Sequence, residues 1–198
     1  MRFFACTAAI IAAAIGSPAL TVIAAENVGL TVSKGPSTEQ APNPEMQGLF
    51  EADQAIRNEI EQRGGWNAVK DDKVFLEKWR REDAVRIERT GELLASNSLQ
   101  AGIDFYRAAF IFQHSEKPED FLKAHHLAVI AISKGYEARW ISAATLDRYL
   151  LGIGRQQIYG TQFLTDESGK YIKRATDQQI VSDAERAFLK VPALAEGW

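Results

Sequence analysis

Gln113, His125 and Asp147 each lie on a predicted helix face that is otherwise apolar. A polar side chain that leaves water needs a hydrogen-bond partner, so we expect these groups to meet one another or nearby backbone. An imidazole oriented by a carboxylate can act as a general base. We therefore predict His125 and Asp147 as candidate catalytic residues. A simpler interpretation stays open, in which His125 is a hydrogen-bonded core residue and Asp147 accepts hydrogen bonds from the loop that follows it.

The predicted helices bring further polar residues to the same end of the fold as Asp147. At a rise of about 1.5 Å per residue, Gln113 lies at the top of its helix and Asp147 about 6–9 Å below the top of another. The loop 152–162, which follows the helix that carries Asp147, starts at this same end. We predict a polar pocket here that binds a small molecule, a peptide or a protein partner. Its candidate ligand-binding residues are Gln113, His114, Arg148, Tyr159, Thr161 and Gln162.

Other site chemistries find no support in the residue patterns. The three histidines have no His-x-x-x-His spacing and the single cysteine is Cys6, so we predict no metal site. No Gly-x-Ser-x-Gly, Gly-x-Gly-x-x-Gly or Walker sequence occurs, so no cofactor is predicted. The formal net charge of −3 provides no basic surplus for binding nucleic acid.

Three acid–arginine pairs are spaced three or four residues apart, the spacing at which side chains on one helix face meet. We expect them to be ion pairs on helix surfaces: Asp53/Arg57, Asp83/Arg86 and Asp183/Arg186.

Helical periodicity dominates the chain from residue 45 onward and sets the fold class. Short connections between the later helices indicate antiparallel neighbours. We predict a mainly α fold, an antiparallel helical bundle with a small C-terminal β-hairpin, in which 98–134 could form a tetratricopeptide-like helix pair. The expected helices are 45–62, 70–95 with a break near Gly91, 98–114 with Ser98 as cap, 118–134, 137–151 and 177–189; the hairpin spans 157–173 and turns at Asp166–Gly169.

Residues 1–25 have the pattern of a signal peptide, with Arg2, a short apolar run and small residues before cleavage points after Ala19, Ala24 or Ala25. The alternative is an uncleaved membrane anchor, but the run is short beside the ~20 apolar residues of a membrane span. Residues 26–45 are rich in Gly and Pro and are predicted to be a flexible linker. We therefore expect an exported protein, periplasmic or secreted, with a single helical domain at 46–198 and membrane contact only through an uncleaved signal segment.

Four short motifs follow one another in the chain: Gln113-His114, Ala124-His125-His126-Leu127-Ala128, Asp147-Arg148-Tyr149-Leu150 and Gln157-Ile158-Tyr159-Gly160-Thr161-Gln162-Phe163. Their order resembles a bacterial family of unknown function, similar to DUF6624. The likeness covers about 98–165 and is weaker at Asp53-Gln54 and at 183–194. One departure is Arg155-Gln156, where the family often has proline before the glutamine. The resemblance implies where a site lies and implies no reaction, because the family has no established activity.

The sequence favours an exported helical protein of an uncharacterised family that binds a ligand or partner at its polar end-pocket. The alternative is a hydrolase or another acid–base enzyme that uses His125 and Asp147. The binding hypothesis and the enzyme hypothesis differ in what they require of His125 and Asp147. A pair enclosed and satisfied by backbone excludes catalysis, whereas a pair that opens into a cleft favours it.

Overall fold

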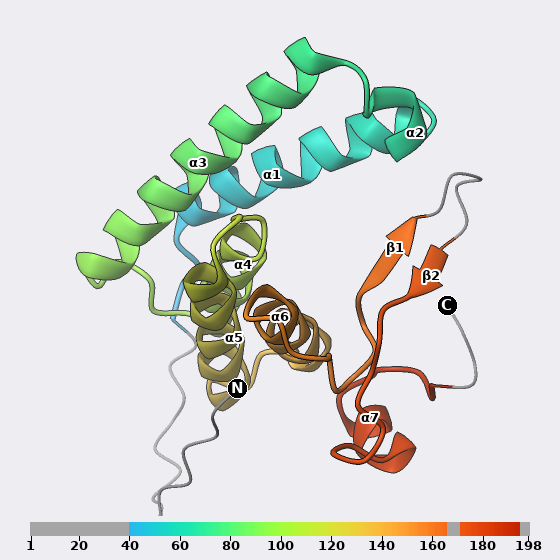
Figure 1. Cartoon of the computed structure of the whole chain (residues 1–198). Helices are drawn as coiled ribbons and strands as arrows, with labels where there is room; N and C mark the ends of the chain where they lie inside the picture. The colour runs from blue at the N-terminus through green and yellow to red at the C-terminus, as the bar shows by residue number, and fades with distance from the viewer. Residues whose placement is uncertain (1–39, 166–170, 195–198) are drawn as a thin grey trace, which may run out of the picture. The chain divides into compact units, whose positions relative to one another are not determined.

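Seven helices and one two-stranded antiparallel sheet make up the part of the chain that the computed structural model describes, residues 40–165 and 171–194 (Figure 1). The predicted mainly α fold class with a small C-terminal hairpin is confirmed. The predicted signal peptide, most of the predicted linker and the turn at Asp166–Gly169 lie outside the described residues. Among the described helices, none has the length and apolar character that a membrane span needs. The elements are α1 (Pro44–Gln62), α2 (Trp66–Val69), α3 (Lys73–Ala95), α4 (Gly102–Phe112), α5 (Pro118–Ser133), α6 (Arg139–Gly152), β1 (Phe163–Thr165), β2 (Tyr171–Lys173) and α7 (Asp183–Phe188).

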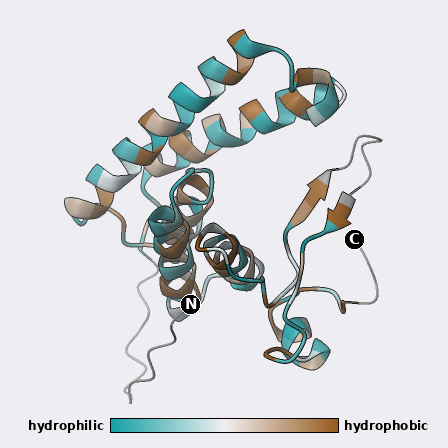
Figure 2. Ribbon diagram, viewed as in Figure 1, coloured by the Kyte–Doolittle hydropathy of each residue, from teal (hydrophilic) through white to brown (hydrophobic). Residues whose placement is uncertain are grey.

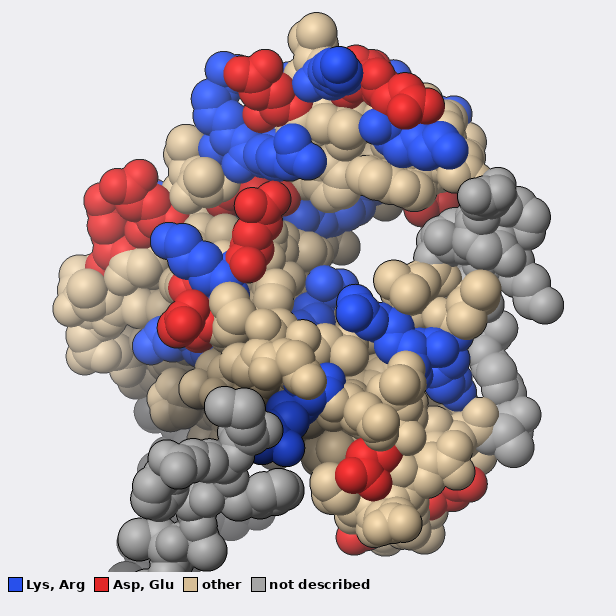
Figure 3. All heavy atoms as spheres, in the orientation of Figure 1, with Lys and Arg blue, Asp and Glu red and all other residues tan. Residues whose placement is uncertain are grey.

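Helices α1 and α3 lie side by side and are connected through the short helix α2 (Figure 1). The side chain of Asn43 caps α1 by accepting a hydrogen bond from the amide of Met46, and Asp72 caps α3 in the same way. The expected break near Gly91 is wrong, because α3 continues through it. A glycine inside a helix costs only about 1 kcal/mol, which the packing of α3 can offset. Much of α3 is polar, and charges of both signs cover the outer side of this helix pair (Figures 2 and 3).

Helix α4 begins later than the sequence indicated, and Ser98 is not its cap. The amide of Ser98 instead donates to the carbonyl of Leu93 and closes the end of α3. The buried carboxylate of Asp104 takes over the capping role, since it accepts from the amides of Gln100 and Ala101. It also accepts from the amide of Asn43 at 2.9 Å, and so joins the start of α4 to the start of α1.

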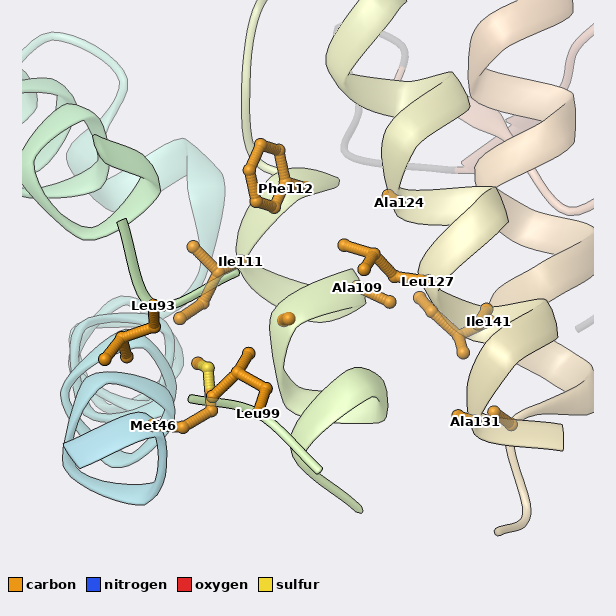
Figure 4. Close-up of a cluster of buried hydrophobic side chains, with 13 residues drawn as sticks. Met46, Leu93, Leu99, Ala109, Ile111, Phe112, Ala124, Leu127, Ala131 and Ile141 are labelled. Carbon is orange, nitrogen blue, oxygen red and sulfur yellow. The ribbon is translucent and has the colours of Figure 1, made fainter. Parts of the chain in front are cut away.

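Helices α4, α5 and α6 pack in chain order around the main apolar core (Figure 4). Proline at the first turn of α5 and a left-handed glycine after it, Gly135 at φ +81°, set its ends as predicted. At Gly102 an added Cβ would lie 2.8 Å from the Cβ of Tyr136, so only glycine allows this close approach. The core residues include Met46, Leu93, Leu99, Ala109, Ile111, Phe112, Ala124, Leu127, Ala131 and Ile141.

The C-terminal part contains less regular structure than predicted. In the hairpin Leu164 lies opposite Ile172, but β1 starts only at Phe163. Before it, Gln157 forms only an isolated parallel bridge with Thr176, and the amides of Ile158 and Thr161 donate to the side chain of Asp147. Helix α7 starts at Asp183 because the side chain of Ser182 forms a capping box with Glu185.

Candidate functional site

An aspartate on α1 and the histidine that follows α4 form the centre of a buried polar network. Nδ1 of His114 lies 2.9 Å from Oδ1 of Asp53, and Nε of Arg57 lies 3.3 Å from Nε2 of His114. A guanidinium can only donate, so Nε2 of His114 must be the acceptor. The ring proton therefore lies on Nδ1 and is donated to Asp53. His114 is held as one neutral tautomer through both of its ring nitrogens.

Arg57 connects this pair to α3. Its NH2 group lies 3.1 Å from Oδ2 of Asp83, and its guanidinium carbon lies 5.4 Å from the ring centre of Trp79. Arg86 donates to the same Asp83 carboxylate at 2.7 Å. The network thus continues from His114 through Arg57 to two residues one turn apart on α3.

We expected three ion pairs on helix surfaces. This is wrong for Asp53–Arg57 and Asp83–Arg86, which are largely buried, and in Asp183–Arg186 only the aspartate is exposed. Both Asp53–Arg57 and Asp83–Arg86 form, at 3.0 and 2.7 Å, but Asp53 is only 1% exposed and Arg86 only 6%. They are buried because α1 and α3 pack against each other along the faces that carry them. In the third pair Asp183 is exposed, whereas the guanidinium of Arg186 is buried against backbone carbonyls of the 158–159 segment.

Burial lowers the pKa of His114 below its ordinary value of 6.5. The hydrogen bond and charge of Asp53 act in the opposite direction, and the charges of Arg57 and Arg148 lower the pKa further. At neutral pH the imidazole is therefore uncharged, which agrees with the tautomer that the hydrogen bonds require.

Arg148 on α6 belongs to the same electrostatic neighbourhood. Its pKa is lowered by burial and by the charge of Arg57, and its own charge acts on His114. The structure thus brings together two of the predicted ligand-binding residues, His114 and Arg148. A third, Gln113, is the buried C-cap of α4, directly before His114.

His114 also forms part of the wall of a cavity of about 440 Å³ between α3 and the 114–120 segment. Asp83 lies in the same wall, so the network reaches the cavity at two points. The remaining lining combines charged and apolar side chains: Arg80, Ala84, Ile87, Glu88, Ser115, Glu116, Lys117 and Asp120.

Asp147 does not pair with His125, and the predicted catalytic pair is wrong. Its carboxylate is fully buried and accepts from the amides of Ile158, Tyr159 and Thr161 at 2.8–3.0 Å, and from the Thr161 hydroxyl at 2.8 Å. His125 instead donates from Nδ1 to the carbonyl of Ser142 at 2.8 Å. Of the two interpretations that the sequence left open, the structure has the one in which the following loop satisfies Asp147.

The other predicted pocket residues from this loop also hold the chain in place. Thr161 bonds to Asp147, and the side-chain amide of Gln162 donates to the carbonyl of Ala144 on α6. Burial, and then the charges of Asp147 and Glu185, raise the pKa of Tyr159. Gly160 has φ +78°, which lets the loop turn its amides toward one carboxylate. The residues that were predicted to form one polar pocket therefore belong to two places, the network around His114 and the loop around Asp147.

The sequence reasoning did not assign Asp53, Arg57 or Asp83 to the site. Two signals pointed to them: the helical spacing of their ion pairs and the weak family likeness at Asp53-Gln54. Gln54 does take part, since its side-chain amide donates to Asp53 at 2.8 Å.

Comparison with known proteins finds no match among family models, curated proteins or solved structures. The resemblance to DUF6624 therefore stays a prediction. Within the described residues, no group of three or more His, Cys, Asp or Glu side chains could hold a metal ion.

Replacing Asp147 with asparagine tests its structural role. We expect Asp147→Asn to lower the free energy of unfolding by about 2–3 kcal/mol, because a buried charge that accepts four hydrogen bonds becomes a neutral amide. Urea denaturation measures the change. The matched control Asp71→Asn, at an exposed aspartate, should stay within about 0.5 kcal/mol of the parent. Equal stability of the two variants would contradict the structural role.

Proposed function

We propose that this chain is a ligand-binding protein whose pocket is organised by the Asp53–His114–Arg57 network. The observation that carries the proposal is a neutral imidazole that is fixed at both ring nitrogens and also faces a cavity. Binding sites in proteins are concave, with a few polar groups held in defined positions. A small molecule, a peptide or a segment of a protein partner would enter beside His114.

The cost of the network supports a role beyond stability. Burying charged groups is expensive, and apolar side chains of similar size would often hold two helices together as well or better. Here Asp53, Asp83 and Arg86 are buried, and together with Arg57 they fix the position of one imidazole. Preorganisation of a functional side chain accounts for this arrangement.

Acid–base catalysis is the second candidate function, with His114 and Asp53 in place of His125 and Asp147. The supporting observation is the hydrogen bond from Nδ1 of His114 to Asp53, because a carboxylate in this position orients an imidazole whose Nε2 can take a proton. In this structure Arg57 occupies Nε2 at 3.3 Å, so a substrate would have to displace that contact.

Export from the cytoplasm is part of the proposal and rests on the sequence of residues 1–25. An apolar run behind a single positive charge and followed by small residues is the signal that export machinery recognises.

Fragment binding tests the pocket. In ligand-observed NMR with a diverse fragment library, we expect fragments that bind the parent protein to be lost on His114→Asn and kept on His126→Asn, since His126 is an exposed histidine. Urea unfolding of both variants checks that they are folded. Hits that bind both variants equally, or a library with no hits, would contradict the proposal. Conversion of a bound fragment during the experiment, lost with His114→Asn, would favour the catalytic candidate.

Processing of the N-terminus tests export. When the full chain is expressed in a bacterial host and the cells are fractionated, we expect the periplasmic form to start at Leu20, Ala25 or Glu26 by intact mass. Ile11→Arg, which places a charge in the apolar run, should keep the chain in the cytoplasm, and Ile11→Leu should not. A cytoplasmic parent protein that retains Arg2 would contradict export.

A further inference from the structure

A stripe of apolar side chains on α5 stays exposed to solvent in the described part of the chain. Leu122 is 42% exposed and Val129 46%, and Ile130 beside them is half-buried. Around the exposed His126 these residues recur at helical spacing, so they share one face of the helix. The same face borders a shallow groove of about 600 Å³. An apolar stripe on a solvent-facing helix indicates a surface that another chain covers.

The two ends of this α5 face carry opposite charges. Glu119 lies in the first turn and Lys134 caps the other end, and both are exposed. The ammonium of Lys134 lies 5.6 Å from the ring centre of Phe105, which keeps it at its end of the helix. The two charges are about 22 Å apart along α5. A second α5 in the same direction would bring like charges together, whereas one in the opposite direction would bring each acid beside a base.

In the opposite direction the apolar residues of the face also match one another. With a two-fold axis at His126, residues equally far before and after it lie opposite each other in the two copies. Leu122 then lies opposite Ile130 of the second copy, and Lys123 lies opposite Val129. The aliphatic part of a lysine side chain can cover an apolar neighbour while its charge stays in water. The face is therefore complementary to itself in charge and in hydrophobicity.

We propose that this protein forms a two-fold dimer in which the α5 faces of two copies pack antiparallel. Self-complementarity of one patch is what a two-fold interface requires. The contact is small, because one helix face of this length buries less than the roughly 1,200 Å² at which stable specific interfaces begin. We therefore expect a weak dimer, with a Kd in the micromolar range. The residues of this face do not line the His114 cavity, so the dimer leaves that cavity open.

Sedimentation velocity of the full chain, from about 5 to 500 μM, tests the dimer. We expect the parent protein to pass from monomer to dimer over this range. Leu122→Asp should raise the Kd at least about tenfold, because the two-fold axis places two new charges in the apolar part of the contact. The matched control Val74→Asp, at a valine on α3 that is 81% exposed, should leave the Kd unchanged. Circular dichroism checks that both variants are folded.

Charge reversal tests the antiparallel direction. Glu119→Lys would place a lysine beside Lys134 of the second copy and should raise the Kd about three- to tenfold. Adding Lys134→Glu should restore a Kd close to that of the parent. In a parallel dimer Glu119→Lys would only replace one pair of like charges with another and leave the Kd unchanged.

Three results would each overturn the proposal. A parent protein that stays monomeric at every concentration would leave this face to a different protein. A dimer that persists unchanged in Leu122→Asp would lie on another surface. A double charge reversal that fails to restore the Kd would exclude the antiparallel packing.

Discussion

The contact on which the rest of the site depends is the guanidinium of Arg57, held between two helices. It pairs with Asp83 on α3, lies over the ring of Trp79 and donates to His114, while its own helix, α1, supplies Asp53 for the opposite side of the imidazole. A planar group with donors on several edges can make these contacts together, and a lysine could not. Arg57 therefore fixes His114 together with Asp53, and it joins α1 to α3 beside the apolar cluster that contains Ile56, Ile60 and Phe75.

This arrangement has an electrostatic consequence for His114. Its pKa lies below 6.5 in the folded protein, whereas in the unfolded chain it returns to that value. As the pH falls below 6.5, the unfolded chain therefore takes up the proton first, and acidification destabilises the fold. The stability that depends on a neutral His114 is present above pH 6.5 and is lost below it.

Local signals made most of the helical fold predictable. Pro118 and Gly135 mark α5, and Gly152–Gly154 end α6, because these residues act through their own backbone preferences. The start of α4 was harder to predict. Asp104, which caps it, is also held by the amide of Asn43, a residue more than sixty positions away in the chain. The helix faces placed His114 and Arg148 at the same end of the fold, and in the structure the charge of Arg148 acts on His114. The helix faces could not predict that amides of residues 158–161 would occupy the carboxylate of Asp147. Nor could they predict the burial of Asp53 and Asp83. Both features depend on which segments meet in three dimensions.

The tautomer of His114 is the most direct measure of whether this network exists. Two-dimensional 15N NMR of the imidazole ring, assigned with the His114→Asn variant, reports which nitrogen carries the proton. The structure requires a neutral ring at pH 7 with the proton on Nδ1, toward Asp53, and a titration midpoint below 6.5. A proton on Nε2, or an imidazolium at neutral pH, would mean that Arg57 does not hold this nitrogen and would contradict the account.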